Sequence, residues 1–306
     1  MRKNLKSGGW FKWLVLGSLY MFVLSSGGCS SSAGDMLFSG YWEGCFVDAP
    51  VYGLTYVATP SGATGVTDTN GVFRYKEGDT IVFKVGNITL PEIPADVIIL
   101  PMSYYADANE DNYEDHLGVT QFVRFMLTAG GVTDDNIDEY FDEDECRILY
   151  IPAADQVFGG ETHVWDINGN LFNTLSDRIT VSAFNAVNHL RQTMDILRRA
   201  FPGDYSGTWE GSVSSQGYTE RGSGTWSFDI LDDLQIIGEA RYGFDSTVIW
   251  GSVSVSGVTD DIEGEVGGLP FRWHGKINPV TGRVEGTWEV YAYGTGGGTF
   301  EGYKRD

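Results

Sequence analysis

Positively charged residues are scarce in this chain of 306 residues. It has 20 Lys and Arg against 42 Asp and Glu, so its formal net charge is −22. A surface of this charge repels phosphate backbones and anionic headgroups, so nucleic acid and anionic lipid are poor partners. Histidine is also rare, and the four histidines are scattered in the sequence without a metal-ligating motif.

The chain also lacks the short motifs that mark common catalytic sites. No G-x-S-x-G, H-E-x-x-H, C-x-x-C-H or P-loop pattern is present. Paired carboxylates leave no local signature, so a carboxylate-pair hydrolase stays open as an alternative. We therefore expect a non-catalytic protein without a cofactor, apart from a calcium ion that one acidic segment could hold.

Long hydrophobic runs are absent, and the longest apolar stretch, WLVLGSLYMFVL, has about twelve residues. That is the length of a signal-peptide core rather than of a membrane span, and four basic residues precede it. Small residues then lead into Cys29. This arrangement resembles the lipobox of bacterial lipoproteins, although Ser26 stands where that family prefers leucine three residues before the cysteine. The resemblance implies a signal peptide over 1–28 and a lipid on Cys29.

The residues after Cys29 are small and polar, as in a flexible tether, which we place at 29–40. Removing the signal takes away four positive charges and leaves a mature chain of charge −26. Ser30 follows the lipidated cysteine, and by resemblance to enterobacterial lipoproteins this favours the outer membrane. Whether the protein faces the periplasm or the outside stays open.

Cysteine is nearly absent, with only three in the chain. If Cys29 carries lipid, Cys45 and Cys146 remain as a pair in an oxidising compartment. A disulfide between them would close a loop of about 100 residues and add up to ~4.7 kcal/mol in the chain-entropy model. The alternative is two buried free thiols.

Short alternating strands dominate 41–101, with turn chemistry at TDTNG and EGD. Phe73 and Tyr75 share one face of a strand, and Ile81, Phe83 and Val85 share a face of the next. This pattern predicts a small β-sandwich. From about 44 to 200, the motifs GLTY, TDTNGVFRYKEGDTIVFKVGNI and AVNHLRQTM resemble the carboxypeptidase-regulatory-like or prealbumin-like module of bacterial surface lipoproteins. The resemblance implies a platform or stalk.

The segment 102–203 combines an acidic loop with two predicted helices, HLGVTQFVRFMLTA and DRITVSAFNAVNHLRQTMDILRRA. In the second helix, an apolar stripe is expected to pack on the sandwich. It comprises Ile179, Ala183, Val187, Leu190, Met194 and Leu197. His189 lies beside this stripe and is expected to be a packed or surface residue rather than a ligand.

Thirteen acidic residues and one basic residue lie between Tyr104 and Cys146. Four oxygen-bearing side chains in DANEDNYED have a spacing that suits Ca²⁺, namely Asp107, Asn109, Asp111 and Asp115. The central glycine and final glutamate of an EF-hand loop are missing. The segment is therefore either a calcium-stabilised loop or a solvated acidic loop.

The last segment, 204–306, repeats SGTWEG, SGTWSF, EGTWEV and GGTFEG on evenly spaced strands. We expect seven or eight antiparallel strands in a closed or nearly closed barrel, and thus a mainly β chain with a helical insert. Five tryptophans are candidates either for filling the interior or for lining a ligand cavity: Trp209, Trp226, Trp250, Trp273 and Trp288. The G-x-W of the first strand also occurs in lipocalins and avidin-like barrels.

Two functions follow from these patterns. The first is a lipid-anchored envelope protein that presents its C-terminal β-domain to a protein or a glycan. The second is a lipid-anchored barrel that binds a small molecule. A barrel filled by tryptophans favours the first, whereas an open interior of several hundred Å³ favours the second.

Overall fold

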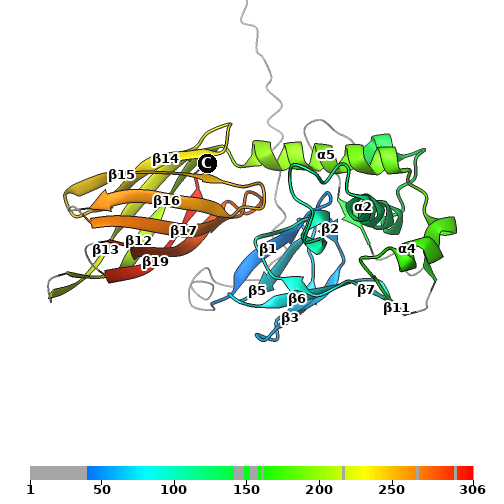
Figure 1. The fold of residues 1–306 in the computed structure, drawn as a ribbon, viewed down its shortest axis with the longest axis horizontal. Coiled ribbons are helices and arrows are strands. Elements are labelled where there is room, and N and C mark those ends of the chain that lie inside the picture. The colour runs from blue at the N-terminus through cyan, green and yellow to red at the C-terminus, as the bar shows by residue number, and fades with distance from the viewer. Residues whose placement is uncertain are drawn as a thin grey trace, which may run out of the picture. The chain divides into compact units, whose positions relative to one another are not determined.

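The computed structural model describes residues 40–140, 148–151, 158–159, 162–215, 218–266, 269–292 and 295–305. Tyr41–Asp306 forms one compact unit. The chain is mainly β, as the sequence predicts, with short sheets and helices before residue 203 and a closed barrel after it (Figure 1). The predicted signal peptide, Cys29 and nearly all of the predicted tether lie outside the described residues.

Three sheets form the N-terminal part, in the orders β5-β1-β9, β10-β2 and β11-β7-β6-β3-β4, with β8 paired to β6. The strands are β1 (Trp42–Phe46), β2 (Val51–Tyr52), β3 (Thr55–Thr59), β4 (Thr64–Val66), β5 (Val72–Tyr75), β6 (Thr80–Val85), β7 (Ile88–Thr89), β8 (Ile93–Pro94), β9 (Ile98–Ile99), β10 (Leu149–Tyr150) and β11 (His163–Val164). Strands β10 and β11 come from the predicted helical segment, so the sheets extend beyond the predicted boundary at 101.

Aromatic rings fill the core of this part. The ring centroids of Phe73 and Phe83 lie 5.1 Å apart, and those of Phe46 and Phe83 also lie 5.1 Å apart, both edge to face. Phe73 and Tyr75 of β5 are buried, as are the alternate residues Ile81, Phe83 and Val85 of β6. The period-2 burial predicted for these two strands is therefore confirmed.

The helical elements are η1 (Pro101–Tyr104), α2 (Leu117–Ala129), η2 (Ile137–Tyr140), α4 (Asn170–Leu175), η3 (Ser176–Arg178) and α5 (Ala183–Ala200). Both predicted long helices are present. Helix α5 begins later than predicted, because the Ser182 side chain accepts from the backbone N–H of Asn185 and caps the helix there. None of the described helices is long and apolar enough to cross a membrane.

The buried face of α5 differs from the predicted stripe at its N-terminal end. Ala186, His189, Leu190, Met194 and Leu197 are buried. Ala183 is exposed and Val187 is half-buried. The prediction was wrong there because Ile179 precedes the helix, so the stripe starts one turn later and rotates toward His189.

The Cys45 thiol is free and buried, and burial raises its pKa to about 12. Its Sγ lies 3.7 Å from Oδ1 of Asn278. The structure therefore shows no disulfide at Cys45, and the predicted bond to Cys146, which lies outside the described residues, is not confirmed.

Residues 203–304 form the closed barrel, in which each strand pairs antiparallel with the next and β12 pairs with β19 (Figure 1). The strands are β12 (Gly203–Ser215), β13 (Tyr218–Ile230), β14 (Gln235–Tyr242), β15 (Asp245–Val253), β16 (Thr259–Val266), β17 (Leu269–Ile277), β18 (Arg283–Val290) and β19 (Thr295–Lys304). This is the predicted meander of seven or eight strands, with eight strands and full closure.

Candidate functional site

The hairpins β12-β13, β14-β15, β16-β17 and β18-β19 all turn at one end of the barrel, which we call the rim. A cavity of about 320 Å³ occupies the interior at this end. Aromatic side chains form much of its wall: Trp209, Tyr242, Phe271, Trp273 and Trp288. The rest of its lining includes small or polar residues near the rim, such as Ser212, Glu220, Gly222 and Asp245.

Strand alternation explains why these residues meet. On β13, Trp226, Phe228 and Ile230 are buried inside the barrel, and Glu220 and Gly222 share their parity nearer the rim. On β17 and β18, Trp273 and Trp288 are cross-strand partners on the inner face. Side chains of one parity from different strands therefore converge on one space.

The interior is filled at the opposite end. The rings of Trp226 and Phe228 stack with centroids 4.8 Å apart, and Tyr205 stacks on Phe228 at 5.5 Å. Both Trp226 and Trp273 are 2% exposed. The barrel is thus packed at the end opposite the rim and hollow toward the rim.

Hydrogen bonds hold the cavity rings in place. The indole N–H of Trp209 donates to the carbonyl oxygen of Arg241 at 3.1 Å, and that of Trp288 donates to the carbonyl oxygen of Glu210 at 3.0 Å. The two indole rings meet nearly perpendicular, at 83° with centroids 5.6 Å apart. These rings are therefore positioned before any ligand arrives.

Glycines make room for the rings. A Cβ atom on Gly222 would lie 2.7 Å from Cε2 of Tyr242, and one on Gly211 would lie 2.4 Å from Cζ2 of Trp288. Contacts this short are not tolerated, so both rings lie against bare backbone.

Two acidic side chains, Glu220 and Asp245, line the cavity. Tyr242 donates from its hydroxyl to Oε1 of Glu220 at 2.6 Å, and this hydrogen bond raises the pKa of Tyr242. Asp245 lies across the β14-β15 turn from Tyr242, its cross-strand partner. Arg241 also borders the cavity, but it has the outward parity of β14 and its guanidinium pairs with Glu239.

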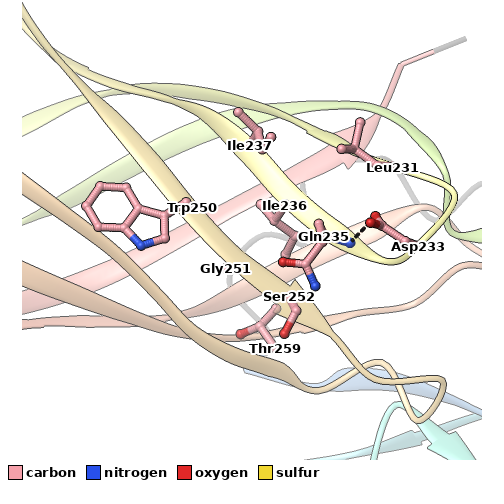
Figure 2. Close-up of a pocket in the computed structure, with 9 residues that line it drawn as sticks. All are labelled: Leu231, Asp233, Gln235, Ile236, Ile237, Trp250, Gly251, Ser252 and Thr259. Atoms are coloured by element: carbon pink, nitrogen blue, oxygen red, sulfur yellow. Dashed lines mark hydrogen bonds between the residues drawn. The ribbon is translucent and has the colours of Figure 1, made fainter.

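A second hollow, wide and open, lies over β14, β15 and the start of β16 and has a volume of about 740 Å³. Figure 2 shows the Trp250 indole toward one end and Asp233, Gln235 and Ser252 toward the other. Trp250 and Ile237 are cross-strand partners, and each is 51% exposed. This outer groove therefore combines an apolar patch with polar side chains.

Four of the five candidate tryptophans lie inside the barrel, and Trp250 does not. Its register partners Ile237 and Glu263 are on the outer face, since their neighbours Ile236 and Ile262 are the buried residues. The expectation that Trp250 fills or lines the interior was wrong, because a tryptophan at an even spacing from outward residues points outward.

Most other cavity residues were not indicated by the sequence pattern, among them Glu220, Tyr242, Asp245 and Phe271. Glu220 could have been found, because it lies six residues before Trp226 on the same strand and so shares its face. Tyr242 and Asp245 flank a turn, where the pattern does not reveal which way a side chain points.

The proposed calcium ligands make local contacts. Asp107 Oδ1 lies 3.1 Å from Nε2 of His116, and Asn109 Oδ1 accepts from the backbone N–H of Asp111. Within the described residues, no group of three or more His, Cys, Asp or Glu side chains is placed to hold a metal ion. Calcium at Asp107, Asn109, Asp111 and Asp115 stays a prediction from spacing.

A buried ionisable pair joins the N-terminal sheets to α5. His189 Nε2 lies 3.5 Å from Oδ1 of Asp48, and both side chains are almost completely buried. Burial raises the pKa of Asp48 to about 8 and lowers that of His189 to about 4. The sequence pattern predicted His189 as either a packed or a surface residue, and the structure shows it packed. The pattern did not indicate Asp48.

No family model matches the chain. No curated protein matches it either. Among solved structures, it is similar to a crystal structure of the vaccine antigen Transferrin Binding Protein B, a double mutant from Haemophilus parasuis Hp5. The two chains are 10% identical with a TM-score of 0.26, and the similarity covers 35% of this chain and 27% of that chain. The chain therefore spans about a quarter of that protein, and a similarity of this size assigns no family.

Proposed function

We propose that this protein is a non-catalytic, lipid-anchored binding protein of the cell envelope whose barrel holds a small ligand. The observation that carries the proposal is the cavity of about 320 Å³ at the rim, walled by fixed aromatic rings. Its size falls in the range of small-molecule sites, which are concave, mostly apolar and largely preformed. A barrel filled along its whole length would have favoured a purely structural or presenting role.

The direct test is to purify the protein from its native source and identify small molecules released on denaturation by mass spectrometry. A stoichiometric compound that rebinds to the emptied protein supports the proposal. Recovery of that compound unchanged after prolonged incubation supports the non-catalytic part. An empty barrel that binds nothing from native extract contradicts the proposal.

A cavity-filling variant sharpens this test. Ala240 lines the cavity and is 5% exposed, so Ala240→Leu puts extra methyl groups into the space that a ligand would occupy. Thr225→Leu is the matched control, because Thr225 is exposed on the outer face of the neighbouring strand. We expect Ala240→Leu to reduce ligand recovery and Thr225→Leu to leave it unchanged, with melting temperatures measured for both.

The lipid anchor rests on the sequence around Cys29, outside the described residues. Two or more acyl chains anchor a protein stably, whereas one holds it only marginally. We expect the wild type to incorporate labelled fatty acid and fractionate with membranes, and Cys29→Ala to do neither. Membrane association of Cys29→Ala equal to that of the wild type would contradict the anchor.

The outer groove supports a second candidate function, the engagement of a protein or glycan partner. Trp250 and Ile237 form an apolar patch in this groove, and each is 51% exposed. Clusters of exposed apolar side chains surrounded by polar residues are typical of interaction sites. Trp250→Ala should abolish capture of such a partner without emptying the barrel, whereas Ala240→Leu should do the reverse.

A further inference from the structure

We infer that the ligand of the rim cavity is a small organic cation, a substituted ammonium group with an apolar remainder. The inference rests on the proposed function, because it specifies the chemistry of the same cavity. Three properties of the wall carry it: the arrangement of its aromatic rings, the sign of its charges and the use of its hydrogen-bond donors.

The rings are arranged so that more than one π-face can meet a ligand. Trp209 lies between Trp288 and Tyr242, with interplanar angles of 83° and 44° and centroid distances of 5.6 and 5.8 Å. Rings inclined in this way form a corner, whereas parallel rings would cover one another. A cation over the face of Trp or Tyr is attracted by the ring quadrupole, and several such rings together form the cages that bind quaternary ammonium groups.

The ionised side chains at the cavity reinforce this preference. Glu220 and Asp245 both belong to its lining and are exposed, so they keep their ordinary access to solvent in the free protein. Arg241 is the single basic residue among the described lining residues, and its charge is directed to Glu239. A low-dielectric wall with acidic groups at its opening concentrates cations and disfavours anions.

Three hydrogen-bond donors of the wall are already used within the protein, which argues against an anionic ligand. The indole N–H groups of Trp209 and Trp288 donate to backbone carbonyls, and the Tyr242 hydroxyl donates to Glu220. An anion would need such donors to replace its lost water. A cation needs none, since the carboxylates and ring faces supply its interactions.

A neutral apolar ligand is also disfavoured at the rim. It would cover Glu220 and Asp245 and remove water from them without supplying a counter-charge, which is costly for a carboxylate. A ligand with an ammonium group beside these carboxylates and an apolar part against Phe271 and Trp273 satisfies both kinds of surface.

The test uses three probes of matched size: benzyltrimethylammonium, its neutral carbon isostere neopentylbenzene, and the anion benzenesulfonate. Binding to the full mature protein is followed by tryptophan fluorescence and by calorimetry. We expect the cation to bind at least about tenfold more tightly than the neutral isostere and the anion not to bind. Added salt should weaken the binding of the cation but not that of the neutral probe.

Two variants of equal charge change locate the effect. Glu220→Gln removes the carboxylate that contacts Tyr242 and should reduce the advantage of the cation by about threefold or more. Glu265→Gln is the control, because Glu265 is exposed and has the outward parity of β16. Equal losses in both variants would show a long-range charge effect and would overturn the assignment to the cavity.

The remaining outcomes separate this inference from the proposed function. If the neutral or anionic probe binds as tightly as the cation or more tightly, and Ala240→Leu weakens that binding, the inference of a cationic ligand is overturned. The cavity then remains a ligand site. Failure of the cation to bind at millimolar concentration also overturns the inference. The proposed function itself falls only if the native extract yields no ligand for the barrel.

Discussion

Tryptophans that look alike in sequence have opposite roles in the barrel, and substitution distinguishes them. Trp226 is 2% exposed and stacks on Phe228, whereas Trp250 is 51% exposed on the outer face. We expect Trp226→Ala to lower the free energy of unfolding by about 3–5 kcal/mol, because it leaves a large cavity. Trp250→Ala should change it by no more than about 0.5 kcal/mol. Urea unfolding of both variants checks this, and equal midpoints would contradict the assigned faces.

The pair Asp48 and His189 predicts a pH dependence of stability. The raised pKa of Asp48, about 8, gives stability that is present below its ordinary pKa of 3.8 and lost as pH rises. The lowered pKa of His189, about 4 instead of 6.5, gives the opposite trend between those two values. The two effects cancel between about pH 4 and 6.5. Above pH 6.5 the folded pair retains one proton that the unfolded chain has lost, so stability falls from pH 6.5 to about 8.

The loss is at most about 2 kcal/mol, at 1.36 kcal/mol for each pH unit. Urea unfolding at a series of pH values measures it. Asp48→Asn is the control, and it should abolish the decline above pH 6.5. Glu285, whose pKa burial raises to about 7, contributes equally to both proteins and cancels in the difference. A wild type and variant with parallel pH profiles would show that the buried pair does not hold the proton.

At the scale of single elements, alternation predicted β5, β6 and the barrel strands, because a strand with one buried face must place apolar residues at every second position. Strand alternation did not predict the rim cavity. Trp209 and Trp226 both follow Gly-Thr in the sequence, yet Trp226 is fully buried and Trp209 only half-buried at the cavity. The difference depends on which residues of the other strands lie at the same height along the barrel axis. That height is set by the register between strands, which local sequence does not contain.

The glycine of β13 opposite Tyr242 gives a test of how an element shapes the cavity. In Gly222→Ala the three atoms nearest to the new Cβ would all belong to the Tyr242 ring, the closest being Cε2 at 2.7 Å. The ring must rotate and lose its hydrogen bond to Glu220, so we expect weaker ligand binding with a nearly unchanged midpoint of unfolding. Ligand titration and urea unfolding of the same variant measure the two effects. A large loss of stability with intact binding would contradict this account.

On the scale of the whole molecule, the barrel should fold without the residues that precede it. Its eight strands close on themselves, so they leave no unpaired edge, and its aromatic core is its own. The barrel also contacts earlier residues: Lys304 Nζ donates to the carbonyl oxygen of Ala200, and Lys276 Nζ lies 3.1 Å from Oδ1 of Asp96 and over the Trp42 ring. None of these contacts closes the strand ladder, which the barrel completes by itself. We expect residues 203–306 to unfold cooperatively in urea with blue-shifted tryptophan emission. Emission typical of solvated indole would refute independent folding.

In the N-terminal part, two long-range strand pairings could not be predicted from the sequence. Strand β10 pairs in parallel with β2, about 100 residues earlier in the chain, and β11 pairs in parallel with β7. Each has only two residues, too short for any periodicity to be seen. Their positions follow from the packing of the sheets and α2, which local patterns do not contain.

Closure of the barrel between its first and last strands has a further consequence. Tyr205 pairs with Lys304, so the chain arrives and departs at the end away from the rim. The turns at the rim connect strands that follow one another in the chain, and Phe244, in the described turn between β14 and β15, is fully exposed. Over evolutionary time, these turns are free to lengthen, shorten or change composition while the strand pairs stay as they are. The residues around the rim can therefore vary among proteins that share this barrel, and with them the surface that a ligand of the cavity would meet first.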